Sequence, residues 1–492
     1  MNHSQTIPPD TKDGTNIQIF LKPTFEDLQS HIEDLTAPPP AETNILNKLL
    51  DQLQEVSFGE DPTIKTIVVQ SIDIILQTAT QNRWGLCKRN GFIYIFNGQY
   101  WSTIDPEEFQ MFLGNAAIRL GVQKLTAKHY EFKEKLFKQF QSTALLPTPE
   151  PATKKILINL KNGTFEFDPD NGNNLRTFST SDFLTYQLPF SYDPDVKAPL
   201  FQAYLDRVLP DKSAQKVLAE YLGYIFVKNS TLKLEKAMIL FGTGANGKSV
   251  FFDVVTALLG SENVSIYTLQ SLTEPNGYYR AKIQNKLVNY ASEINVKMET
   301  SYFKSLVSGE PVEARLPYGQ PFEVTDYARL IFNCNELPKD VEQSNAFFRR
   351  FLIIPFSVTI PKEEQDRHLA SRIIKNELTG VFTWVLSGLE RLLKQGNFTV
   401  CDAADKALTE YQLQSDSAKL FLSDNDYIPH PTDHELIKDL YSLYRVFCNE
   451  EGFKPVNKTN FRKRLEAAGF VTERVSDGNV VYIKKQPNDP FI

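Results

Sequence analysis

Cysteine is scarce in this chain of 492 residues. Its few cysteines lie far apart and form no C-x-x-C pair, which argues against a disulfide framework and a structural zinc site. The chain also lacks a run of about 18 apolar residues, and its polar N-terminus, MNHSQTIPPD, has no signal-peptide core. We therefore expect a cytoplasmic protein with no membrane partner and with reduced cysteines: Cys87, Cys334, Cys401 and Cys448.

An overall excess of positive charge is also missing. The chain has 53 Lys and Arg residues against 60 Asp and Glu residues, a formal net charge of −7. This balance excludes a generally basic coat, so any nucleic-acid site must be a local patch. Apolar residues make up 41% and charged residues 23%, as in ordinary soluble globular proteins.

Changes in composition divide the chain into five predicted segments. Residues 1–45 are polar and contain several prolines, which predicts a flexible segment. Residues 46–150 predict an α+β accessory domain, with two helices up to about residue 80 and a hairpin around Asn97-Gly98. Residues 151–232 predict short strands followed by helices, and residues 233–400 a nucleotide-binding domain. Residues 401–492 predict a separate C-terminal domain.

The most informative segment is GTGANGKS at residues 242–249, which fits the phosphate-loop pattern G-x-x-x-x-G-K-[ST]. An apolar run at 237–241 predicts a buried strand before it, and apolar residues at helical spacing follow it up to Gly260. A strand, a glycine loop and a helix in this order direct backbone N–H groups at phosphates. We expect Lys248 to reach the β- and γ-phosphates and Ser249 to ligate Mg²⁺. The predicted nucleotide-binding residues are Gly242, Thr243, Gly244, Ala245, Asn246, Gly247, Lys248 and Ser249.

Three further predicted strands bring polar residues that suit phosphate transfer. The strand at 286–291 is followed by Glu293, an acid that can polarise the attacking water and contact the metal. Asn335 follows the strand at 329–334, where it can bond both the γ-phosphate and that water. Arg349 and Arg350 stand directly before another strand and can offset transition-state charge. Taken singly, each has an ordinary alternative: a common strand end, a turn-capping Asn, or solvated arginines.

The order and spacing of these pieces closely resemble superfamily III AAA+ helicases, specifically those of phage, plasmid and poxvirus primase-helicases. The resemblance implies an α/β fold: an AAA+ P-loop domain with a parallel sheet core, preceded by an α+β N-terminal region. It assigns residues 242–249 as Walker A, Glu293 as the Walker B acid, Asn335 as the sensor, and Arg349 or Arg350 as an arginine finger acting on a neighbouring copy. Residues 159–165 and 218–224 look like the linker or collar that joins an N-terminal module to the helicase domain in this family.

The same resemblance implies a DNA-contacting hairpin at residues 303–322. Lys304 and Arg315 supply charge there, and Tyr318 supplies a stacking ring. The family often carries lysine or histidine at the hairpin tip, whereas this chain has no cation between Leu316 and Phe322. A plain surface hairpin remains the alternative.

Residues 434–485 predict two helices followed by a two-stranded wing. The second helix has an outer face of cations, which suits a winged-helix domain with that helix in the major groove. Similar domains follow the helicase domain in many primase-helicases. The alternative is a charged face that is merely solvated. The predicted DNA-binding residues of this face are Lys458, Arg462, Lys463 and Arg464.

Together these features predict an ATP-dependent DNA helicase for replication of a mobile genetic element. We expect ATP and Mg²⁺ as cofactors, single-stranded and forked DNA as partners, a homo-hexameric ring, and contacts with host replication proteins. Two alternatives stay open: a bifunctional primase-helicase, and an origin-binding ATPase scaffold that recruits host enzymes. Priming needs clustered acids for two metals, and the first 150 residues show no Asp-x-Asp on a convincing strand. A P-loop metabolic kinase would leave the basic C-terminal helix unexplained.

Overall fold

The computed structural model describes residues 43–89, 91–145, 155–169, 172–292, 294, 298–316, 319–338 and 341–486. The chain divides into two compact units. The smaller unit contains the described residues up to Thr78 together with Glu107–Phe140, and the larger contains Ala79–Pro106 and the described residues from Gln141 onward. The predicted accessory domain at 46–150 is therefore shared between both units.

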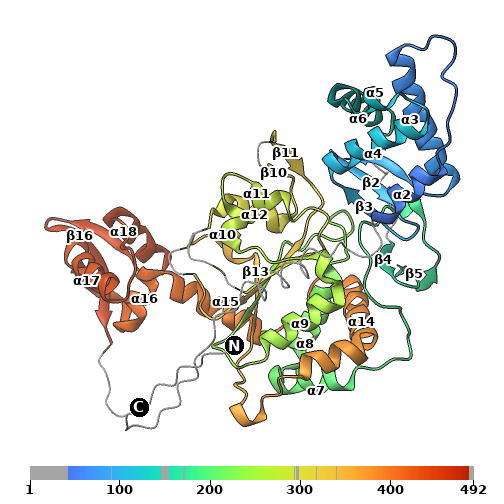
Figure 1. The fold of residues 1–492 in the computed structure, drawn as a ribbon. Coiled ribbons are helices and arrows are strands. Elements are labelled where there is room, and N and C mark those ends of the chain that lie inside the picture. The colour runs from blue at the N-terminus through green and yellow to red at the C-terminus, as the bar shows by residue number, and fades with distance from the viewer. Residues whose placement is uncertain are drawn as a thin grey trace, which may run out of the picture. The chain divides into compact units, whose positions relative to one another are not determined.

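Helices make up the smaller unit (Figure 1). Their apolar sides bury Leu49, Ile72 and Leu113 completely, and the rings of Phe109 and Phe140 pack with centroids 4.6 Å apart. The two helices predicted before residue 80 are confirmed. The helices are α2 (Thr43–Gln52), α3 (Ile64–Gln81), α4 (Pro106–Arg119), α5 (Lys124–Lys128) and α6 (Tyr130–Thr143).

Two small antiparallel sheets begin the larger unit. The predicted hairpin around Asn97-Gly98 is confirmed, and its turn is fixed by the Asn97 side chain, which accepts the N–H groups of Gln99 and Tyr100 at 2.9 Å. The first sheet contains β1 (Leu86–Arg89), β2 (Phe92–Phe96) and β3 (Trp101–Ile104). The second contains β4 (Ile156–Leu160), β5 (Gly163–Phe167) and β6 (Asn174–Arg176).

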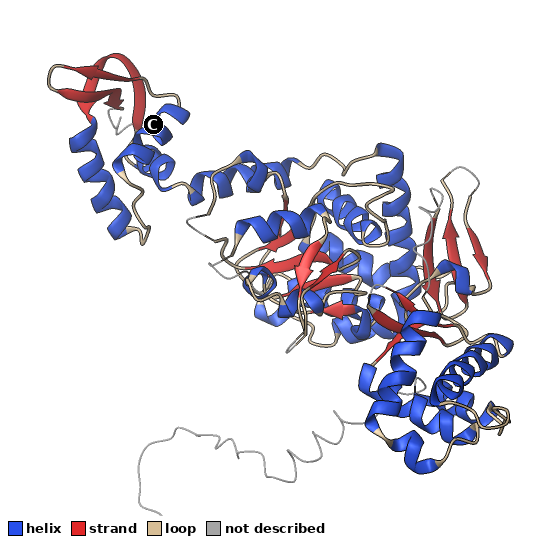
Figure 2. Cartoon of the chain, turned by 90° about the horizontal axis from the view of Figure 1, so that it is seen from above, coloured by secondary structure: helices blue, strands red, loops and turns tan. Residues whose placement is uncertain are grey.

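A five-stranded parallel sheet forms the centre of the larger unit and confirms the predicted parallel core (Figure 2). Its strand order is β13-β7-β12-β9-β8, so β7 lies between β12 and β13. The strands predicted at 237–241, at 286–291, at 329–334 and directly after Arg350 are all present. The strands are β7 (Ala237–Phe241), β8 (Val264–Ser265), β9 (Val288–Ala291), β12 (Arg329–Cys334) and β13 (Phe351–Pro355).

Helices cover both faces of this sheet because side chains alternate along each strand. Met238 and Leu240 of β7 point into a core with α7 (Pro199–Val208), α8 (Lys212–Tyr224), α9 (Lys248–Leu259) and α14 (Leu369–Gln395), where α8 and α9 both pack on α14 (Figure 1). Ala237 and Ile239 point into the opposite core. That second layer includes α10 (Leu269–Thr273), α11 (Tyr278–Ala281), α12 (Thr300–Ser308), α13 (Asn345–Phe348), α15 (Asp402–Ser415) and the hairpin of β10 (Val312–Ala314) and β11 (Phe322–Val324).

The C-terminal residues fold around a core of their own, with Leu440, Tyr444 and Phe461 fully buried. The predicted order of two helices and a hairpin is confirmed. The sequence did not predict the preceding helix or the first strand, which make the sheet three-stranded in the order β14-β16-β15. The elements are α16 (Ser417–Asp424), β14 (Tyr427–Leu436), α17 (Ile437–Glu450), α18 (Lys458–Ala467), β15 (Thr472–Val475) and β16 (Gly478–Lys485).

No helix in the described ranges combines the length and the apolarity needed to cross a bilayer.

Candidate functional site

The loop between β7 and α9 requires glycine at two positions. A Cβ at Gly242 would lie 2.4 Å from the carbonyl oxygen of Phe356. Gly247 has a φ of +85°, and a Cβ there would lie 2.7 Å from Val208 Cγ1. A side chain at either position would therefore displace the loop. The helix begins directly afterwards, at Lys248.

Contacts from distant segments hold this loop in shape. The Tyr204 hydroxyl of α7 donates to the carbonyl oxygen of Gly247 at 2.8 Å, and Asn246 Nδ2 donates to the carbonyl oxygen of Phe356 at 3.1 Å. Ala245, whose carbonyl accepts the backbone N–H of Ile360 at 2.7 Å, has a φ of +48°. Such left-handed backbone at a non-glycine residue persists only where neighbouring structure enforces it. The loop is thus organised by the fold itself, with Thr243, Ala245 and Ser249 exposed.

Two predicted catalytic residues meet at the carboxyl edge of the sheet. β7 and β12 are adjacent and parallel, so the residues that follow them lie close together. Lys248 Nζ donates to Asn335 Oδ1 at 3.1 Å and also to the carbonyl oxygen of Gly242. Burial lowers the pKa of Lys248, while the nearby Cys334 acts in the opposite direction. An ammonium group held by two neutral oxygens in a buried place is suited to receive an anion.

Glu293, the predicted Walker B acid, lies outside the described residues. The strand expected before it is present as β9, the neighbour of β12. Within the described ranges, no group of three or more His, Cys, Asp or Glu side chains is arranged to hold a metal ion. Ser249, in the first turn of α9, is the described residue that offers a predicted metal ligand.

The two candidate arginine fingers lie at the opposite edge of the sheet. Both arginines precede β13, which runs parallel to β7 with Phe351 paired to Ala237. The phosphate loop follows the other end of β7. The arginines and the loop are therefore separated by the length of a five-residue strand, about 15 Å. The side chain of Arg349 is 58% exposed and pairs with Glu235 at 3.1 Å. Arg350 is only 9% exposed and donates to Ser308 Oγ at 2.9 Å. Of the two, only Arg349 presents its guanidinium to solvent.

The predicted DNA hairpin is shorter than expected. Residues 303–308 belong to α12, so Lys304 lies on a helix, where it forms an ion pair with Glu342 at 2.7 Å. The hairpin is β10–β11, and Arg315 holds its tip by donating from Nε to the carbonyl oxygen of Gly319 at 2.9 Å. Tyr318 lies outside the described residues.

The exposed side of this hairpin carries acids. Glu313 and Glu323 are both exposed and lie directly opposite each other in the β10–β11 register. Like charges at paired positions of an antiparallel sheet repel one another. The sequence analysis did not consider this pair.

The four predicted cations of α18 fall into two groups. Lys458 and Lys463 are exposed. Arg462 pairs with Glu466 at 2.8 Å, whereas Arg464 reaches the buried carboxylate of Asp416 at 3.0 Å. Arg462 and Glu466 are four residues apart on one helix, a spacing at which opposite charges pair, so the sequence alone could have indicated the first ion pair. Nothing local predicts the second, because Asp416 is 48 positions away.

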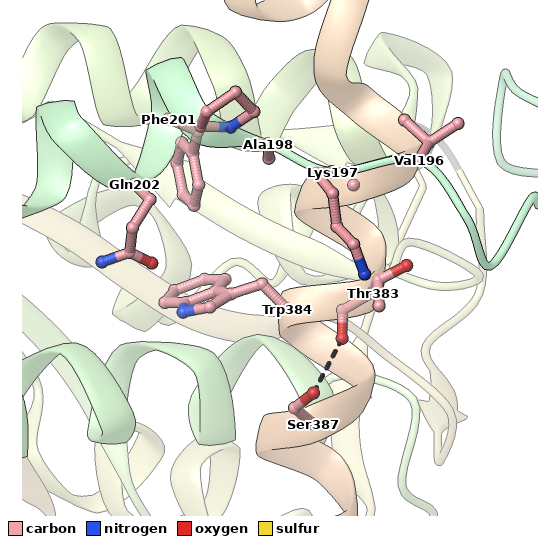
Figure 3. A pocket seen from close by; sticks show the side chains of 10 residues that line it. Val196, Lys197, Ala198, Phe201, Gln202, Thr383, Trp384 and Ser387 are labelled. Carbon is pink, nitrogen blue, oxygen red and sulfur yellow. Dashed lines mark hydrogen bonds between the residues drawn. The ribbon is translucent and has the colours of Figure 1, made fainter.

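A shallow cavity of about 320 Å³ lies beside α7 and α14 (Figure 3). Trp384 and Phe201 form its apolar side, and Lys197 and Gln202 supply polar groups. None of its lining residues belongs to the phosphate loop, so this cavity is separate from the candidate nucleotide site.

Two contributors to the site were missed from the sequence. Tyr204 reaches the loop from α7, about forty residues earlier in the chain, and only the folded structure shows this contact. Glu235 has a weak local signal, since it is the one acid in the segment Lys233-Leu234-Glu235-Lys236 directly before β7. A carboxylate among lysines at a strand start predicts no function by itself.

Two family models match parts of the chain. A family of unknown function, DUF5906, matches residues 240–350, the range that holds the phosphate loop, Asn335 and both arginines. A model described as D5 N terminal like matches residues 73–210.

Similar proteins are viral proteins named as putative helicases. The chain is 23% identical over 361 residues to the putative helicase 121R of Invertebrate iridescent virus 3, covering 65% of this chain and 38% of that protein. It is 23% identical over 211 residues to the putative helicase L207/L206 of Acanthamoeba polyphaga mimivirus, covering 41% of this chain and 22% of that protein. The chain therefore spans less than two fifths of the length of either relative.

Among solved structures, the chain is similar to the apo A form of the NrS-1 C-terminal region. The TM-score is 0.47 at 14% identity, covering 85% of this chain and 99% of that one. A second apo structure of the same region gives a TM-score of 0.47 at 15% identity, covering 87% and 100%. The comparisons thus relate this α/β chain to viral proteins named as putative helicases, at low identity.

Proposed function

We propose that this chain is an ATP-dependent DNA helicase that acts in the replication of a mobile genetic element. We further propose that it assembles as a ring of six copies. The observation that carries this proposal is the division of the candidate catalytic residues between opposite edges of one sheet. Lys248 and Asn335 meet at the carboxyl edge, and Arg349 is exposed at the amino edge. An arginine about 15 Å from the loop of its own copy serves catalysis only on the nucleotide of a neighbour.

The proposed reaction is hydrolysis of ATP at the interface between two copies. Phosphate oxygens replace the Asn335 and Gly242 oxygens around Lys248 Nζ, and the exposed Asn335 amide then orients the attacking water. Glu293 accepts a proton from that water as its oxygen attacks the γ-phosphorus. The bond from the γ-phosphorus to the β–γ bridging oxygen breaks, which leaves ADP and phosphate. Arg349 of the next copy offsets the charge that develops.

Mg²⁺ neutralises phosphate charge when it is bound with the nucleotide. The Ser249 hydroxyl suits this role because it is an exposed oxygen in the first turn of α9. Mg²⁺ is commonly held by one or two protein oxygens together with phosphates and water. Glu293 is the second proposed ligand.

We propose two contacts with DNA. The C-terminal elements follow the order α16–β14–α17–α18–β15–β16, which supports a winged-helix domain with α18 as its recognition helix. Lys458 and Lys463 are exposed there and suit phosphate contacts. Arg464 instead fixes α18 to Asp416. The β10–β11 hairpin, with Arg315 at its tip, is the proposed contact with the translocated single strand, and Tyr318 is the proposed stacking residue.

A second candidate function is an origin-binding ATPase scaffold that recruits host replication proteins. The Glu313–Glu323 pair favours it, because two carboxylates on the hairpin repel a phosphate backbone. Such a scaffold needs the C-terminal DNA contact and ATP-dependent assembly, but it does not need to translocate along DNA or to separate its strands.

Unwinding of a forked duplex by the full chain separates these functions. Wild type is expected to release the labelled strand with ATP and Mg²⁺, and Lys248→Ala is expected to bind DNA without unwinding it. The hydrolysis rate is measured in the same reactions. ATP hydrolysis without strand separation, at every length of single-stranded tail, would overturn the helicase proposal in favour of the scaffold.

A further inference from the structure

Glu235 adopts an unusual backbone conformation directly before β7. Its φ is +52°, in the left-handed region that long side chains rarely occupy. Such a conformation persists only where the surrounding structure enforces it. The residue lies at the same edge of the sheet as the arginines, because the Ala237 N–H donates to the carbonyl oxygen of Arg350 at 2.8 Å.

The Glu235 carboxylate is shared by three cations. Its Oε2 atom lies 3.1 Å from Arg349 Nη2 and 3.6 Å from Arg350 Nη2, and its Oε1 atom lies 3.3 Å from Lys233 Nζ. One negative charge therefore faces three positive charges. The carboxylate of Glu342 also acts electrostatically on Arg350.

The two arginines differ in how freely they can move. Arg350 is tied by Ser308 and the carbonyl oxygen of Ala346, and its buried Nε finds no hydrogen-bond partner among the described residues. Arg349 bonds through its side chain to Glu235 and is otherwise exposed. Rotation about the Arg349 side chain is thus opposed chiefly by this one ion pair.

We propose that Glu235 is a positioning residue that holds Arg349 on its own copy until the γ-phosphate of a neighbouring ATP displaces it. This inference rests on the proposed function. The Glu235–Arg349 pair is partly exposed and therefore weak, whereas a triphosphate end carries more charge and more acceptor oxygens for a guanidinium. Glu235 therefore competes with ATP for Arg349 and sets the ATP concentration at which neighbouring copies engage.

The test compares Glu235→Gln with wild type in the full chain, by DNA-stimulated hydrolysis at increasing ATP concentration. Removing the competing charge is expected to lower the half-saturating ATP concentration about two- to five-fold, the range that a single ion pair near the surface provides, with kcat little changed. The shift is expected to disappear when Arg349→Ala is also present, because the two residues act as a pair. Glu390→Gln is the matched control, since it removes an exposed, ion-paired carboxylate on α14 and is expected to leave the curve unchanged.

Several outcomes would overturn the inference. An equal shift with and without Arg349→Ala, a higher ATP requirement, or a loss of kcat alone would show that Glu235 acts through the fold. If Glu235→Gln does not fold, Glu235→Asn replaces it, because Asn tolerates left-handed backbone better. If Arg349→Ala reduces hydrolysis but the Glu235→Gln shift in half-saturating ATP concentration does not depend on Arg349, the role of Glu235 is rejected and the shared catalytic site is retained. Undiminished hydrolysis in Arg349→Ala would reject the shared catalytic site as well.

Discussion

Arg349→Ala is expected to reduce catalysis and Arg350→Ala to reduce the stability of the fold, although the two arginines are adjacent. Arg349 is exposed and makes one surface ion pair, so its loss should cost at most about 1 kcal/mol of unfolding free energy. Its catalytic cost should be on the order of a thousandfold, as for other arginine fingers. Arg350 is buried against Ser308, so Arg350→Ala should destabilise the fold by about 3 kcal/mol.

The assay for Arg349 is complementation between two inactive variants. Arg349→Ala keeps an intact phosphate loop, and Lys248→Ala keeps an intact arginine. In an equal, freely exchanging mixture, about one interface in four joins the intact loop to the intact arginine, so hydrolysis should recover to about a quarter of the wild-type rate. Thermal unfolding of each variant alone checks that folding is unaffected.

Two results would refute this reasoning. Mixtures that recover no activity, although labelled copies are seen to exchange, would show that the loop and Arg349 of different copies do not share a site. Wild-type hydrolysis by Arg349→Ala alone would show that Arg349 takes no part in catalysis.

Three further changes test other parts of the structure. Gly242→Ala places a Cβ 2.4 Å from the carbonyl oxygen of Phe356, so calorimetry should show lost ATP binding and a lower Tm. Tyr204→Phe removes one hydrogen bond under the loop and should weaken ATP binding about five-fold, at a cost near 1 kcal/mol, while kcat with saturating ATP stays within about two-fold. Lys463→Ala should weaken duplex DNA binding and reduce its salt slope by about 1, because it removes one exposed phosphate contact. Arg464→Ala should instead lower the Tm first, since its guanidinium pairs with a buried carboxylate.

Much of the candidate nucleotide site could be predicted because its pattern is local. The strand, loop and helix around residues 242–249 are contiguous, and each has its own sequence signal. The approach of Lys248 to Asn335 also follows from the sequence, once both preceding segments are taken as parallel strands. Parallel strands leave their carboxyl ends at one edge, whatever the details of packing.

The remaining features depend on contacts between distant segments. The neighbouring sequence does not show which of Arg349 and Arg350 is buried. Arg350 contacts Ser308, 42 residues earlier in the chain, and only the folded structure shows this contact. Lys304 was assigned to the hairpin because the family resemblance implies a hairpin at residues 303–322, whereas the apolar spacing of α12 favours a helix there. Its pairing with Glu342 likewise needed the fold.

Arg349 and Lys248 lie at opposite ends of the strands, and in the proposed assembly this separation limits how copies can associate. A two-fold pair makes two such contacts at once, because Arg349 of each copy then reaches the loop of the other, whereas a head-to-tail arrangement uses a different surface on each partner. In the head-to-tail arrangement that the proposed ring requires, every added copy leaves one unused loop and one unused arginine, until rotation closes the series or a helical filament grows. A small change in the angle between copies would therefore convert a closed assembly into an open one, with the chemistry at each junction intact.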